Sequence, residues 1–537
     1  MLDLLANIPF GVKVTCTLLG LIIYLGYKFI TKNFDYWQKQ NVKFLKPVPV
    51  FGSISSVFLQ KEHLCQFMQR AYHENEGEPF VGYFQGMTPT LLAIDPELIK
   101  KIFVKDFSHF VDHGFQFSEE ADPLQAKNLF HLGGQRWKDI RTKLIPTFTS
   151  GKIKSMFPLI NECNEKFDEY LEILAERNES FEAKDLLGRL FTDIVGSCIF
   201  GIECNSIQNP DNQFRSMGKR LTTKSVVQAF KVLFVVFIPK VFAKFNVRIL
   251  DKDVTEYFKK VTKDMAKTRK ERNIVRKDFL QLLIELKDKG SVAIDEDDED
   301  KYLKKEAFNQ TTSNATFKFD DIDLAAQSTV FFLAGFETSS TLICFTLLEL
   351  AMNQDVQRKA QSEVDKILSQ SNGKITYEIL KEIKYLDWIL KEALRKYPPV
   401  ALHMRMCTKT YKIPDTKVTL QKGTFVAIPN YALQNDPKYF PDPDRFDPER
   451  FSDEELMKKY QYIYTPFGEG PRQCIGNRFA QVQSKLALFT FLRKYTVSKC
   501  PETEFPVKIE EKQFIVTSKS GIFLKIEKRN NLLEKLS

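Results

Sequence analysis

The stretch Phe467-Gly-Glu-Gly-Pro-Arg-Gln-Cys-Ile-Gly476 decides how the chain is interpreted, because it places one cysteine, Cys474, at the end of a glycine-rich loop. A helical pattern begins directly after it, at Asn477. A thiol at a helix N-terminus faces backbone N–H groups and the positive end of the helix dipole, which favour the thiolate. Gly470 allows a tight turn, and Gly476 leaves room for a flat group beside the sulfur. These features favour a thiolate that could bind a ligand, although a buried structural cysteine before a helix also fits a lone cysteine.

The composition is that of one large globular protein of 537 residues, with a net charge of +9 and 43% hydrophobic residues. No repeat or second set of motifs is present, so we expect one catalytic domain. The 9 cysteines lack Cys-x-x-Cys spacing, which indicates reduced thiols on a cytosol-facing domain. A basic balance suits nucleic acid, a membrane surface or an acidic protein. The absence of zinc-finger, helix-turn-helix and RNA-binding motifs argues against nucleic acid.

The N-terminal segment predicts a membrane anchor. Two lysines carry the only charges between residues 8 and 30, and ~20 apolar residues suffice to span a bilayer. No small-residue cleavage site follows, which favours a retained anchor over a cleaved signal peptide. Lysines after the segment predict that its C-terminal side is cytosolic. We expect an anchor over residues 1–30, a linker with a proline-rich hinge over 31–53, and the catalytic domain over 54–537.

Helical periodicity dominates the remainder and predicts helices over residues 137–144, 153–177 and 278–287. Strand-like segments are short and cover residues 90–94, 410–420 and 514–524. The expected fold class is therefore mainly α with a smaller β portion.

One predicted helix is much longer than the others. Asp320 or Asp321 can cap it, and no proline interrupts it before about Asn353. It is apolar on nearly every face, so we expect it to be buried on all sides. It carries Ala334-Gly-Phe-Glu-Thr338, where a buried carboxylate and hydroxyl cost free energy unless they are bonded or used. Thr338 can bond to the carbonyl four residues earlier, and such a bond can open a bulge in the helix.

Two segments depart from this helical pattern. Residues 288–319 include a run of acidic side chains and predict a surface loop, because like charges repel and cannot be buried together. The apolar run 232–239 is too short to span a bilayer. It fits either a buried core segment or a second contact with the lipid interface near the substrate entrance.

The cysteine loop and the Ala334–Thr338 segment together resemble those of the cytochromes P-450, and the resemblance covers nearly the whole chain. The anchor followed by prolines is similar to the microsomal members, and the loop over residues 466–480 is similar to the insect detoxification branch. The resemblance implies the cytochrome P-450 fold with its long central helix. It also implies haem b as cofactor, with Cys474 as the axial thiolate and the metal ligand.

The resemblance assigns roles to further residues. Thr338 and its neighbour Glu337 would help to deliver the protons that cleave the O–O bond. The remaining cofactor-binding residues would be Trp137, Arg141, Ala334, Arg405, Phe467, Arg472 and Gly476. Arginine suits the haem propionates because its planar fork stays charged and holds a carboxylate bidentately.

A Glu-x-x-Arg pair and two histidines have less certain meanings. Spacing alone makes Glu392 and Arg395 an ordinary helix-surface pair. The resemblance instead implies a buried structural triad with Arg450. His109 and His113 match no basic residue of the resemblance with certainty, and each also fits a plain surface histidine.

The substrate would be lipophilic. Val330, Leu333 and Ala334 share the helix face of Thr338, and the resemblance brings Val400 and Ala401 to the opposite side. All are apolar and specify nothing finer. Detoxification of xenobiotics is the expected role, with an endogenous sterol, hormone or fatty acid as the alternative.

The expected reaction is insertion of one atom of dioxygen into this substrate by a haem-thiolate monooxygenase. The chain has no flavin or nicotinamide signature, so electrons would come from NADPH through a flavoprotein reductase, with cytochrome b5 as a further donor. Two alternatives in the same fold are a haem-thiolate isomerase and a haem carrier or sensor, neither of which needs the Glu337–Thr338 pair. We expect a single-pass protein of the endoplasmic reticulum membrane with its catalytic domain in the cytosol. Basic residues that surround Trp137 and follow Cys474 form a candidate reductase face: Arg136, Lys138, Arg141, Lys143 and Arg478.

Overall fold

The computed structural model describes residues 9–222, 231, 245–292 and 318–529. The apolar run 232–239 and most of the predicted loop 288–319 lie outside these residues. The helices before residue 223 are α2 (Phe10–Thr31), α3 (Ser55–Phe58), α4 (Leu64–His73), α5 (Pro96–Lys100), α6 (Pro123–Ala126), α7 (Gly134–Leu144), α8 (Ser150–Arg177), α9 (Ala183–Val195) and α10 (Gln213–Thr222). The later ones are α13 (Lys252–Glu271), α14 (Phe279–Lys289), α16 (Asp321–Met352), α17 (Gln354–Gln370), α18 (Tyr377–Glu382), α19 (Lys384–Lys396), α20 (Asn430–Gln434), α21 (Glu454–Lys459) and α22 (Asn477–Lys494). Helices therefore dominate the fold, as the periodicity predicts.

The strands of the described residues form three small sheets. The largest has the order β1-β2-β7-β4, in which β2 and β7 are parallel and the other pairs antiparallel. Its strands are β1 (Phe80–Gln85), β2 (Thr88–Ala93), β4 (His403–Met406) and β7 (Phe425–Ile428). The second sheet has the order β3-β9-β8 and the third pairs β5 with β6. Their strands are β3 (Phe181–Glu182), β5 (Tyr411–Lys412), β6 (Thr419–Leu420), β8 (Tyr495–Lys499) and β9 (Phe523–Lys528).

The strand predictions are correct only in part. β2 corresponds to the predicted segment 90–94, whereas segment 410–420 is two short strands and segment 514–524 reaches only the start of β9. Strands β1, β3, β4, β7 and β8 lie outside the predicted segments. In the large sheet β1 and β7 are almost wholly buried, so they lack the alternation of polar and apolar residues that marks a half-exposed strand.

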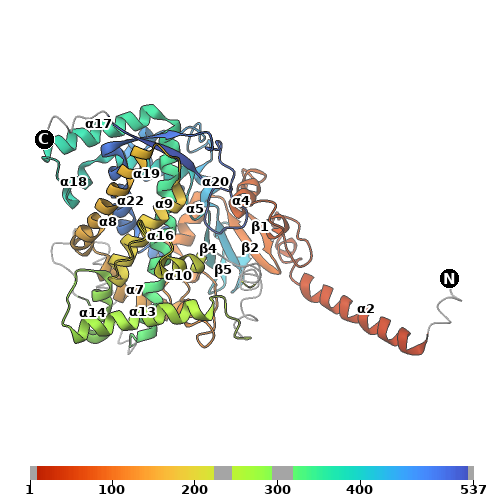
Figure 1. Ribbon diagram of the computed structural model, residues 1–537. Helices are drawn as coiled ribbons and strands as arrows, with labels where there is room; N and C mark the ends of the chain where they lie inside the picture. Colours follow the sequence, from red (N-terminus) through yellow and green to blue (C-terminus); the bar gives the residue numbers. More distant parts are fainter. Residues whose placement is uncertain (1–8, 223–230, 232–244, 293–317, 530–537) are drawn as a thin grey trace.

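The N-terminal helix α2 projects from one side of the domain (Figure 1). None of its residues is buried, although most are apolar. Among the described residues, α2 and α16 are long and apolar enough to cross a membrane. The most apolar window of α16 is 67% buried in the protein, whereas that of α2 is 0% buried. Thus α16 is a core helix, and α2 is the candidate membrane anchor.

Residues after the anchor pack against the large sheet and do not form a free linker. The indole of Trp37 is fully buried and donates to the carbonyl of Tyr83 at 3.1 Å. Phe44 forms a bridge with Gly82. A Cβ at Gly82 would lie 2.5 Å from the Trp37 ring, so the close packing requires glycine there. Much of the segment 31–53 therefore belongs to the folded domain.

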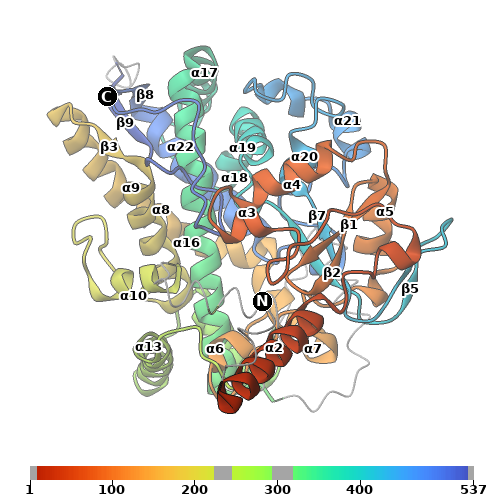
Figure 2. The same ribbon diagram turned by 90° about the vertical axis from the view of Figure 1, so that its right-hand side faces the viewer.

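The long helix α16 begins and ends where the sequence predicts. Asp320 accepts from the amide of Asp323 at 2.7 Å, and Asp323 accepts from the amide of Asp320 at 3.0 Å. This reciprocal cap fixes the start of the helix, and Asn353 follows its last turn. Figure 2 shows α16 running between helices α8 to α10 on one side and strands β1 and β2 on the other. The helix thereby connects the two parts of the domain that surround the candidate site.

Candidate active site

The cysteine loop has the tight geometry that its glycines predict. The amide of Cys474 donates to the carbonyl of Phe467 at 2.9 Å. Gly470 has a φ of 72°, and a Cβ there would lie 2.0 Å from the carbonyl oxygen of Phe103. By contrast, a Cβ at Gly476 would meet nothing closer than 3.9 Å. The loop therefore requires glycine at 470 and has open space at 476, immediately after the cysteine.

The side chain of Cys474 has solvent-accessible surface, although the surrounding protein encloses it. Burial raises the pKa of its thiol, while the amide of Gly476 and the charge of Arg141 act in the opposite direction. Desolvation therefore raises the pKa of the thiol by more than the helix N-terminus and Arg141 lower it, whereas the sequence-based prediction considered only the groups that lower the pKa. A bound metal cation reverses the balance, because a coordinating thiol is deprotonated outright.

Arg472 connects the cysteine loop to the segment that precedes α7. Its Nε donates to the carbonyl of Val111 at 2.8 Å, and its Nη2 donates to the carbonyl of Leu132 at 2.6 Å. The guanidinium lies 4.0 Å from the ring centre of Trp137. The carboxylate of Asp112 is 3.8 Å away, at the limit of an ion pair. Trp137 thus contacts the site through its ring face, and Arg472 keeps only part of its hydrogen-bonding capacity for a ligand.

Arg405 and Arg141 complete a buried basic cluster with Arg472. They are 3% and 8% exposed. Burial, and then the charge of Arg141, lower the pKa of Arg405 to about 9. Its Nη1 donates to the carbonyl of Met404 at 2.9 Å, and its Nε has no hydrogen-bond partner. No carboxylate of the described residues lies within ion-pair distance of Arg405, so this buried guanidinium could hold an anionic ligand.

His113 lies beside this cluster, whereas His109 does not contribute to it. The Nδ1 of His113 is 2.9 Å from the carbonyl oxygen of Phe130. Burial, followed by the charges of Arg405 and Arg472, lowers the pKa of His113 well below its ordinary value. His113 is therefore neutral and adds no charge. His109 packs its ring against Tyr411.

The Ala334–Thr338 segment presents a hydroxyl in the middle of α16. Thr338 Oγ1 donates to the carbonyl of Ala334 at 2.7 Å, which is the back-bond that the sequence predicts. The segment remains α-helical, so this bond does not open the expected bulge. Ala334 is exposed although the C-terminal half of the helix is buried. The face that carries Ala334 and Thr338 therefore borders accessible space inside the domain.

Packing and hydrogen bonds tie this segment to its neighbours. A Cβ at Gly335 would lie 2.8 Å from Val195, so glycine permits the close approach of α9. Gln483 in α22 donates to the carbonyl of Gly335 at 3.0 Å and to the hydroxyl of Ser339 at 2.7 Å. Gln483 lies ~9 Å along α22 from its first residue at 1.5 Å per residue. The helix that follows the cysteine loop is thus bonded directly to the segment that carries Thr338.

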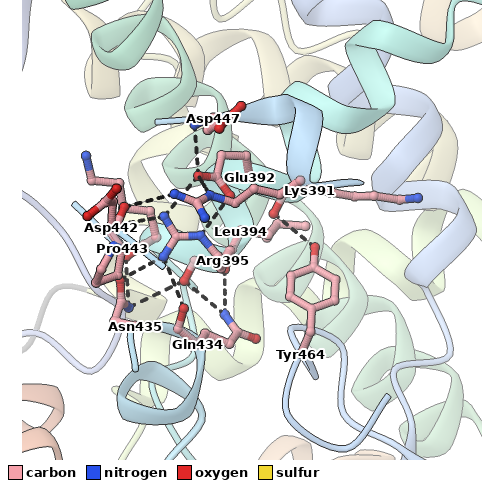
Figure 3. Close-up of polar contacts among 12 residues, drawn as sticks. Lys391, Glu392, Leu394, Arg395, Gln434, Asn435, Asp442, Pro443, Asp447 and Tyr464 are labelled. Carbon is pink, nitrogen blue, oxygen red and sulfur yellow. Dashed lines mark hydrogen bonds and ion pairs between the residues drawn. The ribbon is translucent and has the colours of Figure 1, made fainter. Parts of the chain in front are cut away.

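Glu392, Arg395 and Arg450 form a buried ionic cluster (Figure 3). Arg395 donates to both carboxylate oxygens of Glu392, at 2.7 and 3.0 Å, and both residues are fully buried. It also donates to the carbonyls of Gln434 and Pro443, at 3.1 and 2.7 Å. The Nε of Arg450 lies 3.4 Å from Glu392. The cluster joins α19 to the chain that leads to the cysteine loop, and its bonds go to other protein groups.

The residues expected to contact substrate differ in exposure. Val330, Leu333 and Val400 are half-buried and Ala334 is exposed. Ala401 is 4% exposed and packs in the main core, so it offers little surface to a ligand. The assignment of Ala401 to the substrate side came from the resemblance and stays a prediction.

The proposed basic face is also smaller than the sequence suggests. Arg141 is buried, and Arg136 forms an ion pair with Glu119. Lys143 donates to the carbonyl of Gly290 at 2.8 Å. Lys138 is the exposed member of this group on α7.

Comparisons with known proteins agree with this geometry. The family described as Cytochrome P450 matches residues 42–526, which include every candidate residue of the catalytic domain named above. Cytochrome P450 9e2 of Blattella germanica is 40% identical over 531 residues, covering 96% of this chain and 97% of that protein. Cytochrome P450 6k1 of the same species is 37% identical over 505 residues, covering 94% and 95%. Cytochrome P450 6a2 of Drosophila melanogaster is 36% identical over 515 residues, covering 95% and 97%.

Proposed function

Because this chain belongs to the cytochrome P450 family, we propose that it is a microsomal enzyme that oxidises lipophilic xenobiotics with electrons from an NADPH-dependent flavoprotein reductase. Family membership makes it a monooxygenase, and its relatives are insect cytochromes of the kind that the sequence motifs resemble. The substrate class, the electron donor and the individual residue roles are the proposal.

The basic cluster beside Cys474 carries the proposal. Haem has two propionates, and Arg141, Arg405 and Arg472 are three buried cations that lie near one another. Each arginine can hold a propionate oxygen, because its donors are fixed in one plane. Cys474 would ligate the iron, with accessible space at Gly476 beside it. Haem with a thiolate ligand supplies the reduction of dioxygen and the insertion of one oxygen atom.

Thr338 and Glu337, which lie on the central helix α16, would supply protons for the reaction. The Thr338 hydroxyl donates its hydrogen bond to the carbonyl of Ala334, so its oxygen can accept a hydrogen bond from a water molecule. Glu337 is the next residue along the helix, and its carboxylate is half-buried. In this proposal Glu337 takes protons from water and passes them to the water held at Thr338.

The substrate would lie along the accessible face of α16. The exposed or half-buried side chains there, Val330, Leu333 and Ala334, are all apolar. Such a surface binds by excluding water and selects for lipophilic molecules without specifying their shape. This breadth favours xenobiotics over a single endogenous sterol, hormone or fatty acid.

The anchor α2 would place this site at the endoplasmic reticulum membrane. Its exposed apolar surface suits a lipid environment, and lipophilic substrates concentrate there. We expect the catalytic domain to face the cytosol, where the reductase and cytochrome b5 are reached. Protease added to intact microsomes should digest the domain, whereas full protection would reverse this topology.

The reaction class can be tested with the full-length protein in liposomes with NADPH–cytochrome P450 reductase. A set of lipophilic probes that includes 7-ethoxycoumarin should increase NADPH consumption and give products that carry one added oxygen atom or have lost an alkyl group by oxidation. A haem-thiolate isomerase would rearrange a hydroperoxide without NADPH. A haem carrier or sensor would bind these probes without turnover, and either result would contradict the proposal.

A further inference from the structure

The carboxylate of Glu337 has a specific partner on a neighbouring helix. The Nζ of Lys184, in the first turn of α9, lies 3.0 Å from Glu337 Oε1. The same ammonium donates to the hydroxyls of Ser340 and Thr341, at 2.8 and 2.7 Å, and to the main-chain carbonyl of Glu337 at 3.0 Å. An ammonium has three donors, and the two hydroxyls and the carbonyl occupy all three, while the carboxylate is held as an ion pair. Its position is therefore fixed by one turn of α16.

Three main-chain carbonyls in this turn of α16 accept hydrogen bonds from side chains, some on α16 itself and some on neighbouring helices. Lys184 and the hydroxyl of Ser340 bond to the carbonyl of Glu337, and Gln483 bonds to that of Gly335. The back-bond of Thr338 occupies the carbonyl of Ala334. Lys184 is the only member of this set of described residues that combines a positive charge with contact to the Glu337 carboxylate. Lys184 therefore places a positive charge directly beside this carboxylate.

We propose that Lys184 is a positioning residue that holds the Glu337 carboxylate between proton transfers to the water at Thr338. This inference rests on the proposed role of Glu337. The side chains of Lys184 and Glu337 are 27% and 16% exposed, so water reaches both members of the pair. In each transfer Glu337 takes one proton from water, which weakens its attraction to the ammonium. The neutral carboxyl would then turn from Lys184 and give its proton to the water at Thr338 as that water passes one of its own protons onward, and it would return to Lys184 as a carboxylate.

A purely structural interpretation is that Lys184 only joins α9 to α16. The two interpretations differ in how Lys184 and Glu337 depend on each other. If Lys184 acts through the carboxylate, its removal should matter little once the carboxylate is absent. If it only joins the helices, the two substitutions should have independent effects.

The test is a double-mutant cycle with Lys184→Met, Glu337→Gln and both together. The full-length protein, the reductase and 7-ethoxycoumarin are used, and product formed per NADPH consumed is measured. We expect Lys184→Met to lower this ratio about tenfold, less than the 10²–10⁴ of a direct proton donor. The double variant should be no worse than Glu337→Gln alone, and Lys184→Arg should restore part of the ratio.

A second oxidant separates proton delivery from damage to the site. Cumene hydroperoxide brings oxygen that is already reduced and protonated, so product formation with it should change less than twofold in Lys184→Met. A matched control is Lys485→Met, because Lys485 is also a buried lysine that joins two helices, through Asp387 at 2.9 Å. The Lys485→Met variant should have a lower melting temperature and should form the same amount of product per NADPH consumed.

Each outcome decides between the alternatives. Additive losses in the cycle, or equal losses with NADPH and cumene hydroperoxide, would overturn the role of Lys184. If Glu337→Gln lowers the ratio and Lys184→Met does not, the positioning role alone fails. If Glu337→Gln leaves the ratio unchanged, the proposed role of Glu337 fails, and that of Lys184 fails with it. Should Lys184→Met not fold, Lys184→Gln keeps hydrogen bonds to Ser340 and Thr341 and is judged by the same outcomes.

Discussion

Replacement of Arg405 by methionine should weaken haem retention and at the same time stabilise the polypeptide without haem. Arg405 is buried, its Nε has no partner, and no carboxylate among the described residues is within ion-pair distance. Methionine has a similar length and no charge. An arginine that only supports the fold would behave differently, because its loss would weaken the protein in both forms.

The magnitude follows from the environment of Arg405. Its pKa is lowered to about 9, against an ordinary value of ~12.5, and at ~1.4 kcal/mol per pH unit the charged form is disfavoured by roughly 4–5 kcal/mol. Both pKa values lie above neutral pH, so Arg405 is charged in the folded and in the unfolded chain at pH 7. The free-energy cost of burying this charge is therefore fully present at pH 7. Above pH 9 the unfolded chain retains the proton and the folded chain releases it, so the stability of the haem-free protein should rise with pH. Arg405→Met should remove this rise.

Haem retention is measured by transfer of haem to an excess of apomyoglobin. A hydrogen bond to a charged group contributes about 1.5–3 kcal/mol, so Arg405→Met should release haem about 10 to 100 times faster. Urea unfolding after haem extraction should show a gain of a few kcal/mol at pH 7.

Two control variants make the interpretation specific. Arg405→Lys keeps the charge, so it should keep the cost in the haem-free chain and part of the haem retention. Arg529→Met removes an arginine that is paired with Asp365, and it should leave haem release unchanged. Unaltered haem release in Arg405→Met, or a less stable haem-free chain, would refute the assignment of this cluster to an anionic ligand.

Three other predictions concern the supporting structure. Arg395→Lys breaks the bidentate pair and should lower the free energy of unfolding by about 3–5 kcal/mol. The measurement is the yield of protein that shows the carbon-monoxide spectrum, which should fall, and a normal yield would show that the cluster is dispensable. Gly335→Ala places a Cβ 2.8 Å from Val195 and should cost about 1–3 kcal/mol by overpacking. Thermal unfolding should detect this cost, and Val195→Ala should relieve it; a lack of rescue would assign the effect to the helix itself. Protein without residues 1–31 should keep its haem spectrum and should be released from membranes by a carbonate wash. Retention of this protein on the washed membranes would reveal another membrane contact.

The long helix and the cysteine loop were predictable because their signals are local. The start of α16 depends on Asp320 and Asp323, which cap each other across one turn. The conformation of the loop depends on Gly470, whose positive φ suits glycine in a tight turn. Such features can be identified from neighbouring residues in the chain.

The features that sequence reasoning missed depend on contacts between distant segments. Lys184 lies 153 residues before Glu337, and a lysine at the start of a helix carries no sign of its partner. The burial of Ala401 depends on the packing around it. The resemblance already assigned Arg405 to the cofactor, but only the folded arrangement shows that no carboxylate of the described residues lies within ion-pair distance of it. The helix bulge expected at Thr338 is absent because the back-bond fits within a regular helix.

The identity of the axial ligand is the central claim, and the spectrum of the reduced protein with carbon monoxide tests it most directly. Wild-type protein should show the red-shifted Soret band of thiolate ligation. Cys474→His should retain haem, held by the arginine cluster and a new nitrogen ligand, and should lose that band. A red-shifted band that persists in Cys474→His or Cys474→Ala would contradict the assignment of Cys474.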